Sequence, residues 1–174
     1  LKINPSLVEI IAQGAAQVQQ ALLTGAVDGA AILEPVVSSV LAQDPDARVV
    51  AAGSELFPNQ PGAVMAVREG VLAEHGAQIA ALVAAHQRAT DMLVNDPEAA
   101  APLVAKYVGG GRMDPAIIRA AIERTGASFV ADPNRIVEGT RVMRDFQAEQ
   151  GTLSQPVDLE ALFDLSVYDS VVGN

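Results

Sequence analysis

Short apolar runs alternate with amphipathic stretches over residues 1–67. Glycine, proline or asparagine borders most of these runs, as is usual for strands. Strands are therefore predicted at residues 7–11, 30–33, 48–52 and 63–67. Two intervening stretches, 15–24 and 36–42, space their apolar residues along one helix face and are predicted to be helices. Alternation of strand and helix predicts an α/β fold class with a mainly parallel sheet.

The apolar spacing changes to that of helices after residue 68. A long helix is predicted over residues 71–94. Three Asp-Pro pairs then predict helix starts, because an Asp side chain caps free N–H groups and proline fits the first turn. These pairs begin at Asp96, Asp114 and Asp132. A last short helix is expected after Asp158, so that residues 68–174 should be almost wholly helical.

Composition narrows the class of protein. The 174 residues are enough for a domain with its own core, and 50% of them are hydrophobic. No apolar run reaches the length of a membrane span. The formal net charge of -10 argues against nucleic-acid binding, and the absence of cysteine excludes disulfides and Cys-based sites. Residues 1–5 contain neither an initiator Met nor a cleavable apolar segment, so we expect a mature product or a fragment.

Several short motifs occur in an order and spacing that extend over most of the chain. They lie at residues 8–11, 15–30, 33–35, 48–54, 64–69 and 95–100. In this order the chain resembles the solute-binding proteins for nitrate, sulfonate, taurine and bicarbonate, with their thiamine-precursor relatives. Each motif alone is weak, and the order of all of them carries the resemblance.

The resemblance implies a fold like that of periplasmic binding proteins of type II, with two α/β lobes and a ligand cleft between them. It implies that residues 1–62 are part of the second lobe, that 63–67 are a hinge strand, and that 68–174 are the helical remainder of the first lobe. The sheet of the first lobe is then largely missing from this sequence. We expect the missing N-terminal lobe or a companion chain as a partner, or else a large uncovered apolar face.

A first group of candidate ligand-binding residues lies where the first predicted strand meets a helix. Gln13, Gly14 and Ala15 stand at this junction. Free N–H groups at a helix start attract anions, and the Gln13 amide adds a donor and an acceptor. The alternative is an ordinary connection in which glycine only allows a tight turn.

A second group surrounds Glu34, which precedes Pro35 at the end of a predicted strand. Its carboxylate is expected either to pair with a cationic group of a ligand or only to offset the dipole of the next helix. Ser38 follows on that helix, at the margin of the site or facing solvent. Gln60 lies in a loop that leads to residues 63–67. Ligands of open parallel sheets bind at the carboxyl ends of the strands, so these residues are expected to line one cleft.

Other candidate chemistry is weak. His75 and His86 are about three helical turns apart, too far to bind one metal ion. The run of glycines at 109–111 lacks the Lys-Ser/Thr of a phosphate-binding loop. No catalytic triad or carboxylate pair is recognisable from spacing. We expect neither a metal nor another cofactor.

The resemblance implies an extracytoplasmic solute-binding component of an ABC importer, and not an enzyme. Its ligand would be a small anionic or zwitterionic solute, such as a sulfonate, taurine or nitrate, and its partner the transporter permease. The expected location is the periplasm, or the cell exterior as a membrane-anchored lipoprotein. Two alternatives remain open, a thiamine-pyrimidine-type biosynthetic enzyme and a ligand-sensing domain on the same scaffold.

Overall fold

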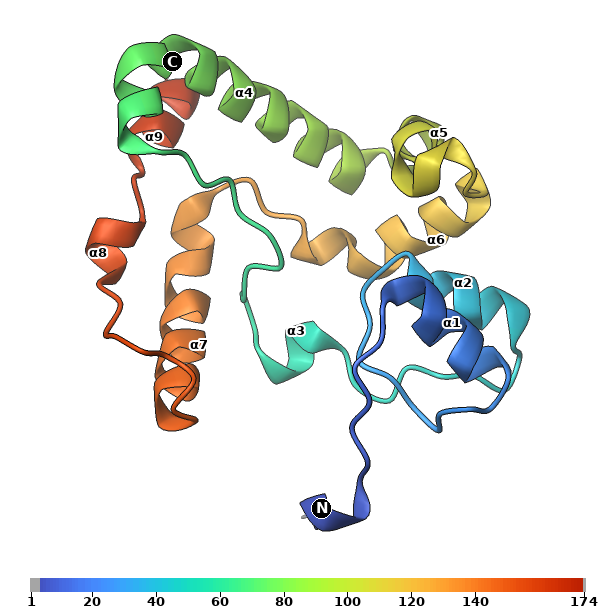
Figure 1. Ribbon diagram of the computed structural model, residues 1–174. Coiled ribbons are helices and arrows are strands. Elements are labelled where there is room, and N and C mark those ends of the chain that lie inside the picture. The colour runs from blue at the N-terminus through green and yellow to red at the C-terminus, as the bar shows by residue number, and fades with distance from the viewer. Residues whose placement is uncertain (1–3, 174) are drawn as a thin grey trace.

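The structure is a computed structural model that describes residues 4–173, and these residues form helices joined by coil (Figure 1). The α-helices are α1 (Ala15–Leu23), α2 (Val36–Gln43), α3 (Gly53–Leu56), α4 (Glu69–Asn95), α5 (Pro97–Tyr107), α6 (Pro115–Thr125), α7 (Val137–Glu149), α8 (Leu159–Leu162) and α9 (Ser166–Val172). Four short 3₁₀ turns also occur, at η1 (Pro5–Leu7), η2 (Val108–Gly111), η3 (Gly126–Ser128) and η4 (Pro133–Ile136).

The predicted α/β fold class is wrong, because residues 4–173 contain no β-strand. The segments 30–33, 48–52 and 63–67 are coil or bends; in 7–11, Leu7 ends the turn η1 and residues 8–11 are coil. Outside the helices, backbone hydrogen bonds of this part of the chain join residues no more than six positions apart. A strand needs a neighbouring strand for its hydrogen bonds, and a run of four or five apolar residues does not form one alone.

The predicted helices are confirmed. The elements α1, α2 and α4 cover the stretches that the apolar spacing selected. The capping carboxylates of Asp96, Asp114, Asp132 and Asp158 each accept a hydrogen bond from a backbone N–H within three residues. At Asp132 the chain first makes the turn η4 and enters α7 only at Val137. Helix starts were predictable because the capping interaction is local.

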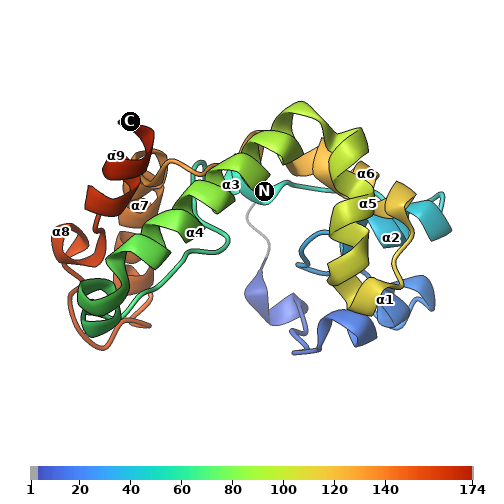
Figure 2. The ribbon, with the colours of Figure 1, turned by 90° about the horizontal axis from the view of Figure 1, so that it is seen from above.

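The helices form two groups that α4 connects, as the view from above shows (Figure 2). In the first group α5 packs against α6, α6 against α2, and α2 against α1. Its core is made of small and branched side chains at Ala100, Ala101, Ala105, Ile118 and Ile122. In the second group α9 packs against α4, and α7 and α8 lie below this pair in Figure 1.

The molecule is open. Its accessible surface is 12642 Å² for a mass of 18.0 kDa, whereas a compact monomer of that mass exposes roughly 8,000 Å². The excess includes the apolar segments for which strands were predicted: Ile10 is 91% exposed and Val50 is 89% exposed. The large uncovered apolar surface expected from the sequence is therefore present. The division into lobes at 1–62 and 68–174 stays a prediction, whereas 63–67, expected as a hinge strand, is coil.

Candidate functional site

Glu34 lies directly before α2, and its carboxylate connects two helices. Its Oε2 accepts a hydrogen bond of 3.0 Å from the backbone N–H of Ser38, in the first turn of α2. Its Oε1 lies 3.0 Å from Nε of Arg124, near the end of α6. The Glu34 side chain is only 15% exposed. Glu34 thus caps α2 and holds α2 against α6.

The surroundings of Glu34 leave polar atoms without hydrogen bonds. Glu34 Oε1 and Arg124 Nε form an ion pair by distance, but Oε1 has no aligned hydrogen-bond donor among the described residues. The hydroxyl of Ser38 is buried and also has no hydrogen-bond partner there. Arg124 is 42% exposed, and among residues 4–173 it forms an ion pair with Glu34 alone. We call Glu34, Ser38 and Arg124 the α2–α6 polar corner.

The corner combines a carboxylate, a hydroxyl and a guanidinium. A guanidinium has five N–H donors in a planar fork, which matches a sulfonate, carboxylate or nitrate. Because Glu34 engages only one edge of Arg124, further donors remain for an anionic group. The carboxylate is already neutralised by Arg124, which reduces its repulsion of an anion.

The structure places the first predicted group at the start of α1. Gly14 is the N-cap residue, and its N–H donates a hydrogen bond of 2.9 Å to Oε1 of Gln17. The Gln17 side chain therefore folds back over the helix start. Gln13 is exposed coil before the cap, and Ala15 is the first residue of α1.

Gln60 belongs to a loop that lies against α7. The carbonyl of Asn59 and the N–H of Gln60 approach Gly139 so closely that a Cβ at Gly139 would collide with them. The ring of Phe57 meets that of Phe146 edge to face, with centroids 5.7 Å apart. The structure thus joins Glu34 with Ser38, whereas no hydrogen bond or ion pair within the described chain joins Gln13 or Gln60 to them.

Nothing in the sequence marked Arg124 as a site residue. The residue is 90 positions from Glu34 in the chain, and only the packing of α6 on α2 brings the two together. Arginine is common near helix C-termini, because its charge interacts favourably with the helix dipole. The position of Arg124 in the sequence therefore did not indicate a ligand contact.

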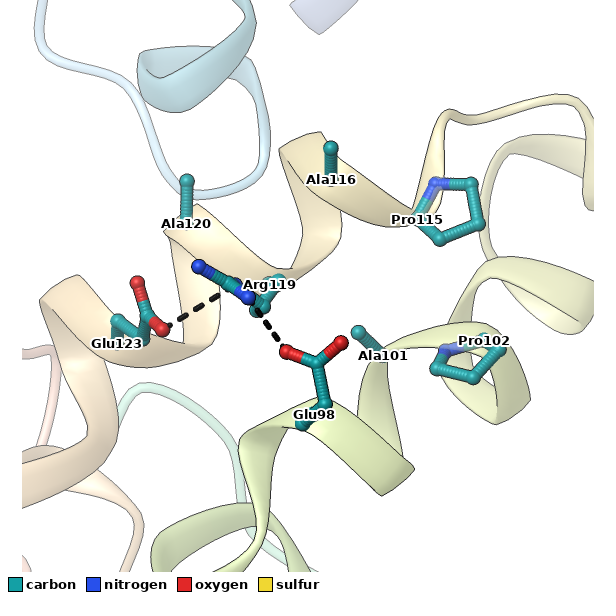
Figure 3. Close-up of a pocket in the computed structure, with 8 residues that line it drawn as sticks. All are labelled: Glu98, Ala101, Pro102, Pro115, Ala116, Arg119, Ala120 and Glu123. Atoms are coloured by element: carbon teal, nitrogen blue, oxygen red, sulfur yellow. Dashed lines mark hydrogen bonds and ion pairs between the residues drawn. The ribbon is translucent and has the colours of Figure 1, made fainter.

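An open hollow of about 350 Å³ lies between α5 and α6 (Figure 3). Its lining consists of Glu98, Ala101, Pro102, Pro115, Ala116, Arg119, Ala120 and Glu123. The hydrogen bond from Arg119 to Glu98, and the charges of Glu123 and Glu98, raise the pKa of Arg119. With two carboxylates on one guanidinium, this hollow is less suited to an anion than the α2–α6 polar corner.

Residues 4–173 contain no group of three or more His, Asp or Glu side chains placed to hold a metal ion. His75 and His86 are both exposed on α4, and His75 lies 4.0 Å from Glu74. None of the helices described is long and apolar enough to cross a membrane.

Comparison with known proteins gave one match. The profile of the NMT1-like family matches residues 2–109, which is more than half of the chain. The match includes Glu34 and Ser38 and ends before Arg124. No curated protein and no solved structure matches the sequence.

Proposed function

This chain belongs to the NMT1-like family, and from this premise we propose that it is the extracytoplasmic solute-binding component of an ABC importer. The family is one of solute-binding and related scaffolds, which implies a small-molecule ligand. The family match over residues 2–109 is the observation that carries the proposal. The transport role is our inference from it.

The solute that we propose is small and anionic or zwitterionic, such as a sulfonate, taurine or nitrate. The α2–α6 polar corner supports this, because Arg124 offers N–H donors beside the hydroxyl of Ser38 and the carboxylate of Glu34. Gln13, Gly14, Ala15 and Gln60 stay predicted ligand contacts, and no hydrogen bond or ion pair among the described residues joins Gln13 or Gln60 to the corner.

We propose binding without catalysis. Acid–base chemistry at neutral pH commonly uses a histidine. His75 and His86 both lie on α4, and neither forms a hydrogen bond or an ion pair with Glu34 or Ser38. This supports a binding protein over a biosynthetic enzyme on the same scaffold.

The proposed partners are the permease of the importer and a further lobe or companion chain. Delivery to a permease requires a location outside the cytoplasm, in the periplasm or on the cell surface as a lipoprotein. The exposed apolar segments around Ile10 and Val50 support a companion, since such surface is normally covered in a stable protein.

Thermal unfolding with candidate solutes tests the proposal. Taurine, methanesulfonate, nitrate and bicarbonate are each added at millimolar concentration to the purified chain, with sodium chloride at equal ionic strength as the control. A solute at 100 times its Kd stabilises the folded state by about 2.7 kcal/mol, which raises Tm by roughly 5–10 °C for a chain of this size. If no solute in the panel raises Tm above the chloride control, the proposal is wrong.

A further inference from the structure

The inner part of the α2–α6 polar corner is closed to solutes in this structure. The hydroxyl of Ser38 and Oε1 of Glu34 are both buried, and Ser38 as a whole is only 3% exposed. The side chain of Arg124 is the most exposed of the three, at 42% against 15% for Glu34. A solute can therefore approach Arg124 directly, but it reaches the hydroxyl of Ser38 only if the corner opens.

Glu34 carries an anionic group of its own at the guanidinium that the proposed solute would bind. One oxygen of its carboxylate lies 3.0 Å from Nε of Arg124, and the other accepts the N–H of Ser38 at 3.0 Å. Because the chain itself holds this carboxylate in place, its effective concentration at Arg124 is high. An anionic solute therefore competes with Glu34 for the same N–H donors.

The hydroxyls of the two neighbouring serines on α2 differ in their contacts. The hydroxyl of Ser39 accepts hydrogen bonds from the side-chain amides of Gln19 and Gln43, at 3.0 and 3.1 Å, and so helps to join α1 to α2. The buried hydroxyl of Ser38 has no hydrogen-bond partner among the described residues. A buried hydroxyl without a partner destabilises a fold, and alanine at this position would favour the helix more. The Ser38 hydroxyl is therefore free for a group that enters when the corner opens.

We propose that the ion pair between Glu34 and Arg124 is an autoinhibitory contact, which the anionic solute displaces when it binds. The guanidinium turns from Glu34 to the solute, and the hydroxyl of Ser38 then donates a hydrogen bond to it. Exposed side chains change rotamer in picoseconds to nanoseconds, so Arg124 can turn without movement of α6. This inference rests on the proposed function, because it states how the same site is regulated.

Calorimetric titration of Glu34→Gln with methanesulfonate tests the autoinhibitory contact. A neutral amide holds a guanidinium less strongly than a carboxylate does, so the variant should lower Kd at least fivefold relative to the wild-type protein. Glu98→Gln is the matched control, because it removes the same charge from the chain and releases Arg119, which also lies on α6. It should leave Kd within twofold.

A double variant separates displacement of Arg124 from simple repulsion of the solute by Glu34. In Arg124→Gln there is no guanidinium to release, so the further change Glu34→Gln should alter Kd less than twofold. If Glu34→Gln tightens binding equally with and without Arg124, Glu34 acts by repulsion alone and the autoinhibitory contact is wrong.

The two serines test the part assigned to Ser38. Ser38→Ala should keep or raise the Tm of the solute-free protein, because its hydroxyl has no partner to lose, and it should raise Kd for methanesulfonate at least fivefold. Ser39→Ala should lower Tm, because two hydrogen bonds are lost, and leave Kd within twofold. An equal fall of Tm in both variants, or an unchanged Kd in Ser38→Ala, would overturn the role of Ser38.

The outcomes distinguish a failure of this inference from a failure of the proposed function. If the wild-type protein binds methanesulfonate and Glu34→Gln binds it equally or more weakly, the autoinhibitory contact is wrong and the proposed function stands. If neither the wild-type protein nor Glu34→Gln binds any solute of the panel, both are wrong.

Discussion

The carboxylate of Glu34 lies 3.0 Å from the guanidinium of Arg124, across the contact between α2 and α6. This ion pair joins the region that matches the family profile to a helix beyond its end. The ion pair also restrains the side chain of Glu34, which was predicted from the sequence to contact the ligand. Glu34 therefore has a structural role in the chain, whatever it contributes to binding.

The structural role predicts the effect of removing the carboxylate. Glu34→Ala should lower the free energy of unfolding by about 1–2 kcal/mol, because α2 loses its cap and Arg124 its partner. Glu34→Gln keeps an oxygen for the N–H of Ser38 and should cost less than about 1 kcal/mol. Urea unfolding followed by circular dichroism measures both. Equal losses for the two variants would contradict a capping role.

Gly139 supports the loop that contains Gln60. Gly139→Ala introduces a Cβ that collides with the backbone of Asn59, so the loop must move away from α7. We expect a destabilisation of about 1–3 kcal/mol. Gly76→Ala is the matched control: Gly76 follows the break in α4 at His75 and has nothing near an added Cβ, so alanine there should change the free energy of unfolding by less than about 0.5 kcal/mol. Thermal unfolding measures both variants. If Gly139→Ala and Gly76→Ala lower Tm equally, the close contact between Gly139 and the backbone of Asn59 is contradicted.

The start of α6 depends on Asp114. Its side chain accepts a hydrogen bond of 2.8 Å from the N–H of Ala116, and α6 supplies Ile118 to the core. Asp114→Ala should therefore reduce the free energy of unfolding by about 1 kcal/mol. Asp28→Ala is the control, because it removes the same charge from an exposed residue outside the helices. It should change the free energy of unfolding by less than about 0.5 kcal/mol. A loss of similar size in Asp28→Ala would show a charge effect in place of capping.

Local interactions explain which parts of the fold were predictable. The cap at Asp114 and the span of α4 follow from neighbours within a few residues, and both agree with the structure. The strand predicted at 7–11 was wrong, because its apolar pattern has no hydrogen-bonding partner within the described chain. A sequence pattern indicates which secondary structure a segment favours. A β-strand also requires a second segment with which its backbone can pair.

The candidate site was predictable only in its local contact. The capping of α2 by Glu34 was one of two alternatives in the sequence, since residues before a helix commonly cap it. The pairing with Arg124 was not predictable, because it depends on how α6 packs. The convergence of Gln60 with Glu34 assumed a common sheet edge. That edge does not exist in residues 4–173, and Gln60 lies against α7 instead.

Calorimetric titration with taurine and methanesulfonate tests the central claim, that this protein binds a small anionic or zwitterionic solute at the α2–α6 polar corner. Arg119→Gln is the control for Arg124→Gln, because both arginines lie on α6, are about equally exposed and contact carboxylates. We predict that the wild-type protein binds at least one of the two solutes. Arg124→Gln should weaken that binding at least tenfold, whereas Arg119→Gln should change Kd less than twofold. Absence of binding to the wild-type protein, or equal losses in both variants, would contradict the claim.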